Sequence, residues 1–198
     1  MKYVLAIPMV ILSFMGCKQV SKSTSKSFSK VIIEPIIEDS LLNIRALEVG
    51  EYILKAVSSV GDVYTYDMDT NQIRVERISE DTLNFRSSAL VNDSFLALSI
   101  GSPAYLFKNK ALVYKETHPA VFYDALHFWN SEEGIAVGDP TDDCMSVLIT
   151  RDGGDTWQKI SCKLLPPALE GEAAFAASDT NIASVGDHTW VATGGFSS

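Results

Sequence analysis

Apolar and polar residues alternate in short runs from residue 41 onward, which predicts a chain built from β-strands. In each successive stretch, a second strand-like run closes on a glycine, at Gly61, Gly101, Gly138 and Gly186. These glycines are 40, 37 and 48 residues apart. A period near 40 residues with strand-like patterning alone is typical of β-propeller blades, each of which is a four-stranded sheet.

We therefore predict an all-β fold, a β-propeller with units at about 41–78, 82–117, 120–162 and 170–198. No helix is predicted after residue 17. Each of the first three units is expected to supply four strands, at residues 43–49, 53–61, 63–67 and 72–78; 84–91, 95–101, 104–108 and 111–115; and 122–129, 134–138, 144–150 and 156–161. The fourth unit is expected to supply strands 173–178 and 181–186, which makes about three and a half blades.

The first 17 residues have a different pattern. Lys2 precedes an apolar stretch over residues 4–15, and Gly16-Cys17 closes it. Twelve residues are too short to cross a hydrocarbon core of about 30 Å, so this segment is predicted to be a signal peptide. A small residue followed by cysteine resembles a bacterial lipobox, which implies a lipid on Cys17. An ordinary signal peptide with a chance cysteine is the alternative.

Residues 18–30 contain five serines, four lysines and no acid, and we expect them to form a flexible tether. The four lysines could also lie against anionic lipid headgroups. Residues 1–30 carry five positive charges and the whole chain carries −9, so the rest carries −14. An acidic body argues against nucleic acid as a partner. Lys18 follows the cysteine, so we expect an exported protein anchored in the outer membrane.

Residues 150–157 read Thr-Arg-Asp-Gly-Gly-Asp-Thr-Trp. They resemble the Asp-box of sialidase-type propellers, Ser/Thr-x-Asp-x-Gly-x-Thr-Trp, through Thr150, Asp152, Gly154, Thr156 and Trp157. The glycines favour a hairpin turn, and the aspartate can accept hydrogen bonds from backbone N–H groups in that turn. The tryptophan supplies an apolar plate that fixes the hairpin to the sheet. We interpret the motif as structural.

Cys144 and Cys162 flank this motif symmetrically. If Thr150 pairs with Thr156, paired positions sum to 306, and so do 144 and 162. The two cysteines would then face each other across one antiparallel ladder, close enough for a bond. An exported protein keeps such bonds, so we predict a disulfide. Two free buried thiols are the alternative.

The third unit also carries a resemblance to a known family. Residues 130–139 read Asn-Ser-Glu-Glu-Gly-Ile-Ala-Val-Gly-Asp, and the Asp-box follows one strand later. This arrangement resembles photosystem II stability/assembly factor-like propellers, which belong with the BNR-repeat and sortilin-type propellers. The resemblance implies scaffold or assembly work on other proteins and usually no catalysis. No cofactor is predicted. The resemblance also implies rings of six or seven blades, so we expect the chain to be the N-terminal part of a longer protein; a four-bladed ring is the alternative.

Candidate ligand-binding residues lie at the starts of the innermost strands, which line the channel mouth in a propeller. Arg45 and Arg86 occupy matching places in the first two units. Aligning the units puts Tyr123 and Asp124 there in the third unit and Glu172, or Glu170, in the fourth. Arginines facing carboxylates around one mouth could bind an acidic ligand. A solvated rim of paired charges is the alternative.

No metal site is predicted. The three histidines lack metal-binding spacing, and His127 is expected to be a hydrogen-bonded core residue. Asp139, Asp142 and Asp143 offer three carboxylates within five residues, but they lack the glycine and closing glutamate of a dedicated calcium loop. A solvated turn is the favoured interpretation.

The sequence thus favours a non-catalytic, lipid-anchored β-propeller that binds a protein or glycan partner at its channel mouth. The first alternative is a sialidase-like glycoside hydrolase whose arginine triad and Tyr/Glu nucleophile pair would be completed beyond residue 198. The second is an oxidoreductase, which rests only on how some similar lipoproteins are labelled. The fold cannot separate these functions, because propellers host all of them.

Overall fold

The computed structural model describes residues 27–175 and 180–196, so the predicted signal peptide and the lipidation of Cys17 lie outside the described residues. The chain divides into two compact units, Met1–Glu38 and Asp39–Ser198. Within the first unit, the described residues 27–38 form no strand, and the side chains of Val31, Ile32 and Ile33 are exposed. The second unit contains all the described strands.

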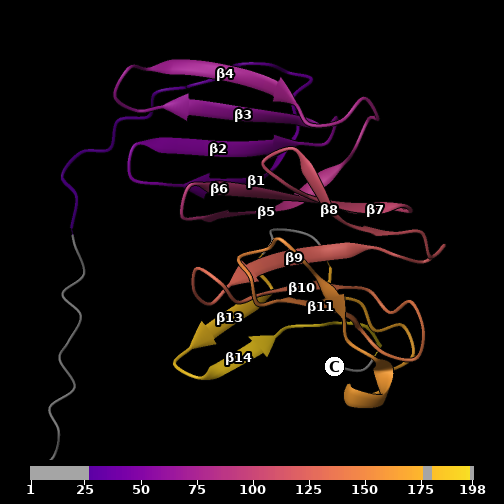
Figure 1. The fold of residues 1–198 in the computed structure, drawn as a ribbon. Helices are drawn as coiled ribbons and strands as arrows, with labels where there is room; N and C mark the ends of the chain where they lie inside the picture. Colours follow the sequence, from indigo (N-terminus) through magenta and orange to yellow (C-terminus); the bar gives the residue numbers. More distant parts are fainter. Residues whose placement is uncertain (1–26, 176–179, 197–198) are drawn as a thin grey trace, which may run out of the picture. The chain divides into compact units, whose positions relative to one another are not determined.

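Three four-stranded antiparallel sheets and one two-stranded sheet make up the second unit (Figure 1). We call the sheets blades 1 to 3 and the terminal hairpin. Blade 1 contains β1 (Ile44–Val49), β2 (Ile53–Ser58), β3 (Asp62–Asp67) and β4 (Gln72–Arg77); blade 2 contains β5 (Phe85–Val91), β6 (Ser94–Ser99), β7 (Ala104–Lys108) and β8 (Ala111–Glu116); blade 3 contains β9 (Tyr123–Phe128), β10 (Gly134–Gly138), β11 (Ser146–Thr150) and β12 (Gln158–Lys159); the terminal hairpin contains β13 (Ile182–Val185) and β14 (His188–Val191).

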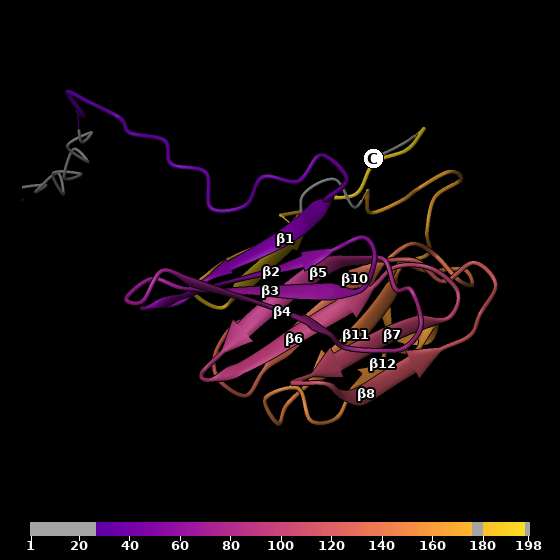
Figure 2. The same cartoon turned by 90° about the horizontal axis from the view of Figure 1, so that it is seen from above.

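Within each blade, strands adjacent in sequence pair with one another, and the blades meet through their first strands, since β5 contacts both β1 and β9. Figures 1 and 2 show the sheets stacked on one another in chain order. Four-stranded antiparallel sheets joined through their innermost strands are the arrangement of a β-propeller. The fold is therefore all-β, with about three and a half blades, as predicted.

Apolar side chains fill the three layers between consecutive sheets, because each strand alternates its side chains between two faces. A core lies between blades 1 and 2, another between blades 2 and 3, and a third between blade 3 and the terminal hairpin. Representative residues of the three layers are, in that order, Val57 and Phe107, Leu106 and Leu148, and Val137 and Ile182. Each middle sheet is thus apolar on both faces.

Tight turns set the ends of the strands. Asn71, Asn92 and Asn109 have positive φ angles of 56°, 52° and 49°, a backbone region that asparagine tolerates better than most residues. The predicted strands 104–108 and 134–138 match β7 and β10 at both ends. Outside the strands, Cys162–Leu164 forms one 3₁₀ turn in the described part of the chain.

The fourth unit differs from the prediction. Part of the expected strand 173–178 lies outside the described residues, and Ala173 makes an isolated bridge to Gly194. The expected strand 181–186 corresponds to β13 (Ile182–Val185). Its partner β14 was not predicted, because His188–Val191 is too short a run to show a period of its own.

The Asp-box forms a hydrogen-bonded hairpin at the end of blade 3. The Thr156 backbone N–H donates to Asp152 Oδ1 at 2.9 Å, and the Thr156 hydroxyl donates to Asp152 Oδ2 at 2.6 Å. Asp152 itself is exposed, whereas the buried Gly154 N–H donates to the hydroxyl of buried Thr150 at 3.0 Å. Asp152 therefore accepts a backbone N–H of the turn, as predicted, whereas the buried N–H of Gly154 is satisfied by Thr150.

Trp157 joins this hairpin to the sheet. Its indole Nε1–H donates to the Gly154 carbonyl at 3.1 Å, and its ring meets Phe128 edge to face with centroids 5.8 Å apart. Gly154 has φ +89°, and a Cβ there would lie 2.6 Å from Leu96 Cδ2 of blade 2. Only glycine fits this position, because the turn needs positive φ and also packs against the neighbouring blade.

The pairing register next to the hairpin differs by one residue from the prediction. Leu148 pairs with Lys159 and Ile149 with Gln158, so paired positions sum to 307 rather than 306, and Thr150 does not pair with Thr156. Cys144 and Cys162 lie just beyond this ladder and form a disulfide with a Cα–Cα distance of 5.4 Å. The bond links the loop after β10 to the end of the hairpin.

Candidate functional site

Three β-bulges occur at equivalent places in the innermost strands. The β1–β2 register shifts between Ile44 and Ala46, the β5–β6 register between Phe85 and Ser87, and the β9–β10 register at the end opposite Gly138. The residues that these shifts leave out of the ladders are Arg45, Arg86 and Asp124. A bulge residue is turned out of the regular alternation of a strand, and bulges are frequent beside functional sites.

The three bulge residues have different surroundings. Arg45 is half-buried and lines a pocket. The Arg86 guanidinium lies 6.0 Å from the centroid of the Phe122 ring, and its Nε is buried without a hydrogen-bond partner. Asp124 is 1% exposed. The structure thus puts two partly buried arginines and one fully buried carboxylate at matching positions of adjacent strands.

Tyr123 is fully buried and does not line a channel mouth. Its hydroxyl donates to Glu116 Oε2 at 2.8 Å, and the Tyr114 hydroxyl donates to the same oxygen at 2.8 Å. Lys159 from β12 contacts the other carboxylate oxygen of Glu116 and donates to Thr141 Oγ1 at 2.7 Å. These residues form a polar cluster that ties the last strand of blade 2 to blade 3.

Electrostatics fix the protonation states of this cluster. Burial raises the pKa of Glu116, but the hydrogen bonds from Lys159, Tyr123 and Tyr114 and the charge of Lys159 outweigh it, so the pKa is lowered overall. Burial and the hydrogen bond to Glu116 raise the pKa of Tyr114 to about 12, and burial raises that of Tyr123 further. Both tyrosines therefore stay neutral hydrogen-bond donors to an ionised carboxylate.

Glu172 lies in another part of the molecule from Arg45. It lines an acidic loop pocket together with Asp139, Asp142 and Asp143. Its carboxylate accepts hydrogen bonds from the Leu169 N–H at 2.8 Å and the Thr193 hydroxyl at 2.6 Å, and these bonds, Thr193 first, lower its pKa. These hydrogen bonds hold the loop around Glu172 in place. The predicted cluster of five residues is therefore not assembled in one pocket.

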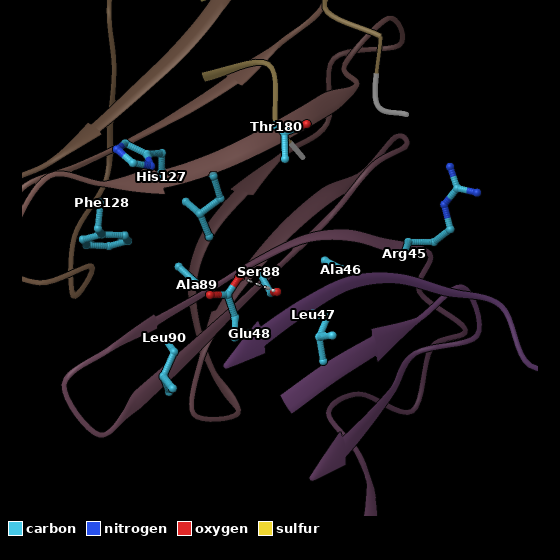
Figure 3. Close-up of a pocket in the computed structure, with 11 residues that line it drawn as sticks. Arg45, Ala46, Leu47, Glu48, Ser88, Ala89, Leu90, His127, Phe128 and Thr180 are labelled. Carbon is cyan, nitrogen blue, oxygen red and sulfur yellow. Dashed lines mark hydrogen bonds between the residues drawn. The ribbon is translucent and has the colours of Figure 1, made fainter. Parts of the chain in front are cut away.

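The pocket that Arg45 lines has a volume of about 480 Å³ and runs across β1, β5 and β9 (Figure 3). Its polar centre is the Glu48 carboxylate, which accepts a hydrogen bond from the Ser88 hydroxyl at 3.2 Å. In the view of Figure 3, Arg45 stands at one end and His127 and Phe128 at the other, with the arginine directed away from the Glu48–Ser88 pair. We call this the inner-strand pocket.

Sequence reasoning missed Glu48 and Ser88. Each occupies a mid-strand position with no turn or motif nearby, so the only signal was a polar residue on a strand expected to be apolar on both faces. His127 was expected to be hydrogen-bonded, and its Nε2 lies 2.6 Å from the Ser184 hydroxyl of the terminal hairpin.

Burial governs the titration of both ionisable groups in this pocket. Burial raises the pKa of Glu48, with hydrogen bonds from Ser88 and the Leu90 backbone partly opposing it. Burial likewise lowers the pKa of His127, which favours the neutral imidazole at pH 7. The pocket floor therefore presents a carboxylate whose pKa lies above its ordinary value and a neutral imidazole ring.

The described residues contain no group of three or more histidine, cysteine, aspartate or glutamate side chains placed to hold a metal ion. In particular, Asp139 Oδ1 accepts a hydrogen bond from the Ala174 N–H at 2.8 Å, which fastens its loop to the following unit. Among residues 27–175 and 180–196, no helix is long and apolar enough to cross a membrane.

No family model matches the chain, and no curated protein matches it. Among solved structures, the chain is similar to U3-55K, with 10% identity and a TM-score of 0.48 over 62% of this chain and 40% of that one. It is also similar to the computationally designed Ika4 protein, with 15% identity and a TM-score of 0.46 over 66% of this chain and 79% of that one. A structure of YCF48 bound to a D1 peptide shows 18% identity and a TM-score of 0.44, over 63% and 42% of the two chains.

The chain thus spans about two fifths of the length of U3-55K. All three TM-scores are below 0.5. The assignment of the fold class therefore rests on the strand order and blade packing of this chain itself.

Proposed function

We propose that this protein is a non-catalytic binding scaffold whose bulge arginines hold an acidic segment of a protein partner. The observation that carries the proposal is the coincidence of three bulges with charged residues, Arg45, Arg86 and Asp124, on adjacent innermost strands. A single charge at the rim of a propeller needs no functional explanation. Bulges that recur at the same level of adjacent strands, each with a charged residue, indicate a feature that the blades share.

The chemistry of the row favours a carboxylate ligand. Guanidinium groups bind carboxylates through two parallel hydrogen bonds, which gives directionality as well as charge. Residues beyond 30 carry a net charge of −14, so an acidic partner is repelled everywhere except where local positive charge compensates. A pair of arginines on adjacent strands is such a place, and it would select for a partner that presents its carboxylate there.

The buried Tyr123–Glu116 pair argues against Tyr123 as the nucleophile of a hydrolase. A Tyr/Glu pair is the nucleophile that a sialidase-like hydrolase requires. Here the tyrosine is fully buried, its pKa is raised by burial, and its hydroxyl is engaged by a carboxylate that Lys159 also contacts. A nucleophile must reach its substrate, and this one is packed inside the sheet stack.

The experiment measures binding of short fluorescent peptides that end in aspartate or glutamate. Each peptide is compared with a form whose carboxylates are replaced by amides. We expect binding only of the carboxylate forms, and at least a roughly tenfold loss in Arg45→Ala and in Arg86→Ala, because a charge-assisted hydrogen bond contributes about 1.5–3 kcal/mol. Arg74→Ala, which removes an exposed arginine from β4, is the matched control.

Equal binding by the Arg45→Ala/Arg86→Ala double variant and the unchanged protein would overturn the proposal. Binding of sialylated glycans in place of the peptides, with the same arginine dependence, would replace the protein partner by an acidic sugar. Turnover of a sialoside by the chain would refute the non-catalytic role.

We further propose that the scaffold is held at the outer membrane by a lipid on Cys17. The Gly16-Cys17 junction after a short apolar stretch and the serine- and lysine-rich segment that follows support this placement. Mass spectrometry of the mature protein should find acyl mass on Cys17 and residues 1–16 removed. A mature protein with an unmodified thiol at Cys17 would disprove the anchor.

A further inference from the structure

The Glu48 carboxylate at the centre of the inner-strand pocket is bonded by two neutral donors. The Ser88 hydroxyl donates to its Oε1 at 3.2 Å, and the Leu90 backbone N–H also donates to the carboxylate. Among the residues that the structure describes, none of the ion pairs includes Glu48. Glu48 is therefore a partly buried carboxylate with no cation beside it in the described part of the chain.

Glu116, another carboxylate that joins two blades, is compensated by a cation. It accepts hydrogen bonds from Tyr114 and Tyr123, and Lys159 contacts its other oxygen. Moving a carboxylate out of water costs free energy that neutral donors offset only in part, so buried charges are normally paired with an opposite charge. Within its described residues, the molecule supplies that cation at Glu116 and not at Glu48.

The pocket has room beside Glu48 because the matching residue of blade 2 is small. Three residues beyond the bulges, the innermost strands carry Glu48, Ala89 and His127. Glu48 is bonded to Ser88 of the next sheet, and His127 lies 2.6 Å from the Ser184 hydroxyl of the next sheet. Ala89 ends at its Cβ, and it lines the pocket of about 480 Å³. The pocket therefore offers space for a ligand group next to the carboxylate.

The two strands that hold this carboxylate are neighbours within the described stack. β1 carries Glu48, β5 carries its two donors, and the two strands contact each other directly. In Figure 3 the Glu48 side chain is directed toward Ser88, and Arg45 is directed away from both. Sheets added beyond either end of the stack would not come between β1 and β5, so the environment of the carboxylate is set by residues that the structure describes.

The surroundings favour an ammonium group on an apolar stem. A compact ammonium can approach a carboxylate that already accepts the Ser88 hydroxyl, whereas a guanidinium needs both oxygens for its two parallel bonds. Leu90, Leu126 and Phe128 line the same pocket, and apolar walls of this kind suit the methylene groups of a lysine side chain. Burial lowers the pKa of His127, so its imidazole adds no competing positive charge at pH 7.

We propose that Glu48 binds a lysine side chain of the protein partner, next to the acidic residue that Arg45 holds. The acidic residue rests on the proposed function, whereas the ammonium site rests on the pocket alone. Arg45 and Glu48 are three residues apart on β1, which corresponds to roughly 10 Å at about 3.3 Å per residue. In an extended partner segment, this separation places the lysine two or three residues from the acidic residue.

The test compares fluorescent peptides that end in aspartate and carry one lysine, one to four positions before that aspartate. Each peptide has a counterpart with norleucine, which lacks the ammonium group. We expect the full chain to bind the best-spaced lysine form at least roughly tenfold more tightly, the size of a charge-assisted hydrogen bond. Glu48→Gln should remove this preference, and melting temperature checks that the variant is folded. Glu51→Gln, which changes an exposed glutamate between β1 and β2, is the matched control and should keep the preference.

The arginine variants separate this proposal from the proposed function. Equal binding of the lysine and norleucine forms, with binding still dependent on Arg45 and Arg86, would overturn the ammonium site and leave the acidic-segment site standing. A lysine preference that requires Glu48 but persists unchanged in the Arg45→Ala/Arg86→Ala double variant would support the ammonium site and contradict the acidic-segment site.

A titration with n-butylamine tests the pocket without any peptide. This amine presents the same ammonium group on an apolar stem, and it should shift the NMR signals of the Leu90 and Leu126 methyl groups in the unchanged protein but not in Glu48→Gln. 1-Butanol is the uncharged control. If n-butylamine binds as tightly as the best lysine peptide, the occupant is a free amine and not a lysine of the partner. No shift with the amine, together with no lysine preference, would overturn the ammonium site altogether.

Discussion

Blades 1 and 3 have the same strand order but are stabilised in different ways. Blade 3 is packed on both faces, and its hairpin is fixed by the Asp-box, by Trp157 and by the Cys144–Cys162 disulfide. Blade 1 is packed on one face, and every residue of β4 (Gln72–Arg77) is exposed. Two units with the same strand order are therefore stabilised differently, one by bonds within the unit as well as packing on both faces and the other by packing against a single neighbouring sheet.

The largest expected difference between the blades concerns a single apolar side chain. Trp157→Ala should lower the free energy of unfolding by about 3 kcal/mol or more, because it removes the edge-to-face contact with Phe128 and leaves a cavity. Val75→Ala in blade 1 should cost less than about 1 kcal/mol, because that side chain is largely exposed. Urea unfolding of both variants under identical conditions makes the comparison. Similar losses would mean that the two blades are equally packed.

The same contrast explains how much the sequence could predict. Blade 3 was predicted almost strand by strand, because its signals are local: turn residues, the Asp-box and two symmetric cysteines. The four-stranded units and the equivalence of Arg45 and Arg86 also followed from the repeat. The burial of Tyr123 could not be predicted, because the core that covers it gathers side chains from both blade 2 and blade 3.

The candidate binding residues were predicted only in part, because the repeat locates some of them and not others. Asp124 does occupy the position equivalent to the two arginines, because alignment of repeats finds matching places along each strand. Glu172 was misplaced, because the fourth unit departs from the repeat before its first strand. Glu48 and Ser88 were missed, because their contact crosses from one blade to the next and leaves no pattern within either strand.

Loss of the disulfide should be the next largest effect. The bond closes a loop with a sequence separation of 18, for which the chain-entropy account gives about 3 kcal/mol. Cys144→Ala together with Cys162→Ala should lower the urea midpoint by the corresponding amount, and reduction of the unchanged protein should have a similar effect. The double variant should be indifferent to reductant. Peptide mapping that recovers both thiols free from unreduced protein would contradict this bond.

The aspartate of the Asp-box should contribute less, and only above acidic pH. Hydrogen bonds from the Thr156 side chain and backbone lower the pKa of Asp152 to about 2. A carboxyl group whose pKa is depressed by folding stabilises the folded state above its unfolded pKa, near 3.9, and this stabilisation disappears as pH falls toward the folded value. Because the side chain is exposed, solvent screening limits the effect to about 1 kcal/mol.

Asp152→Asn makes this prediction measurable. The difference in unfolding free energy between the unchanged protein and the variant should be constant from pH 7 to about pH 5 and shrink between about pH 4 and pH 2. Asp155→Asn is a suitable control at the neighbouring position, since its partner Lys108 holds it by an ion pair rather than by the turn. A difference that does not change with pH would assign the stabilisation to packing instead of to the charge.

The smallest expected loss of stability concerns Arg86, the bulge residue of blade 2, in comparison with Arg45 of blade 1. The Arg86 guanidinium packs over the Phe122 ring, so Arg86→Ala should cost about 0.5–1 kcal/mol, the range for a cation–π contact that is partly exposed. Arg45→Ala in blade 1 should cost less than about 1 kcal/mol. A double-mutant cycle with Phe122→Leu isolates the Arg86 contact, because the coupling energy excludes the packing that each residue makes elsewhere. If the coupling energy is near zero while peptide binding still falls in Arg86→Ala, then Arg86 contributes to ligand binding and its contact with Phe122 does not contribute to stability.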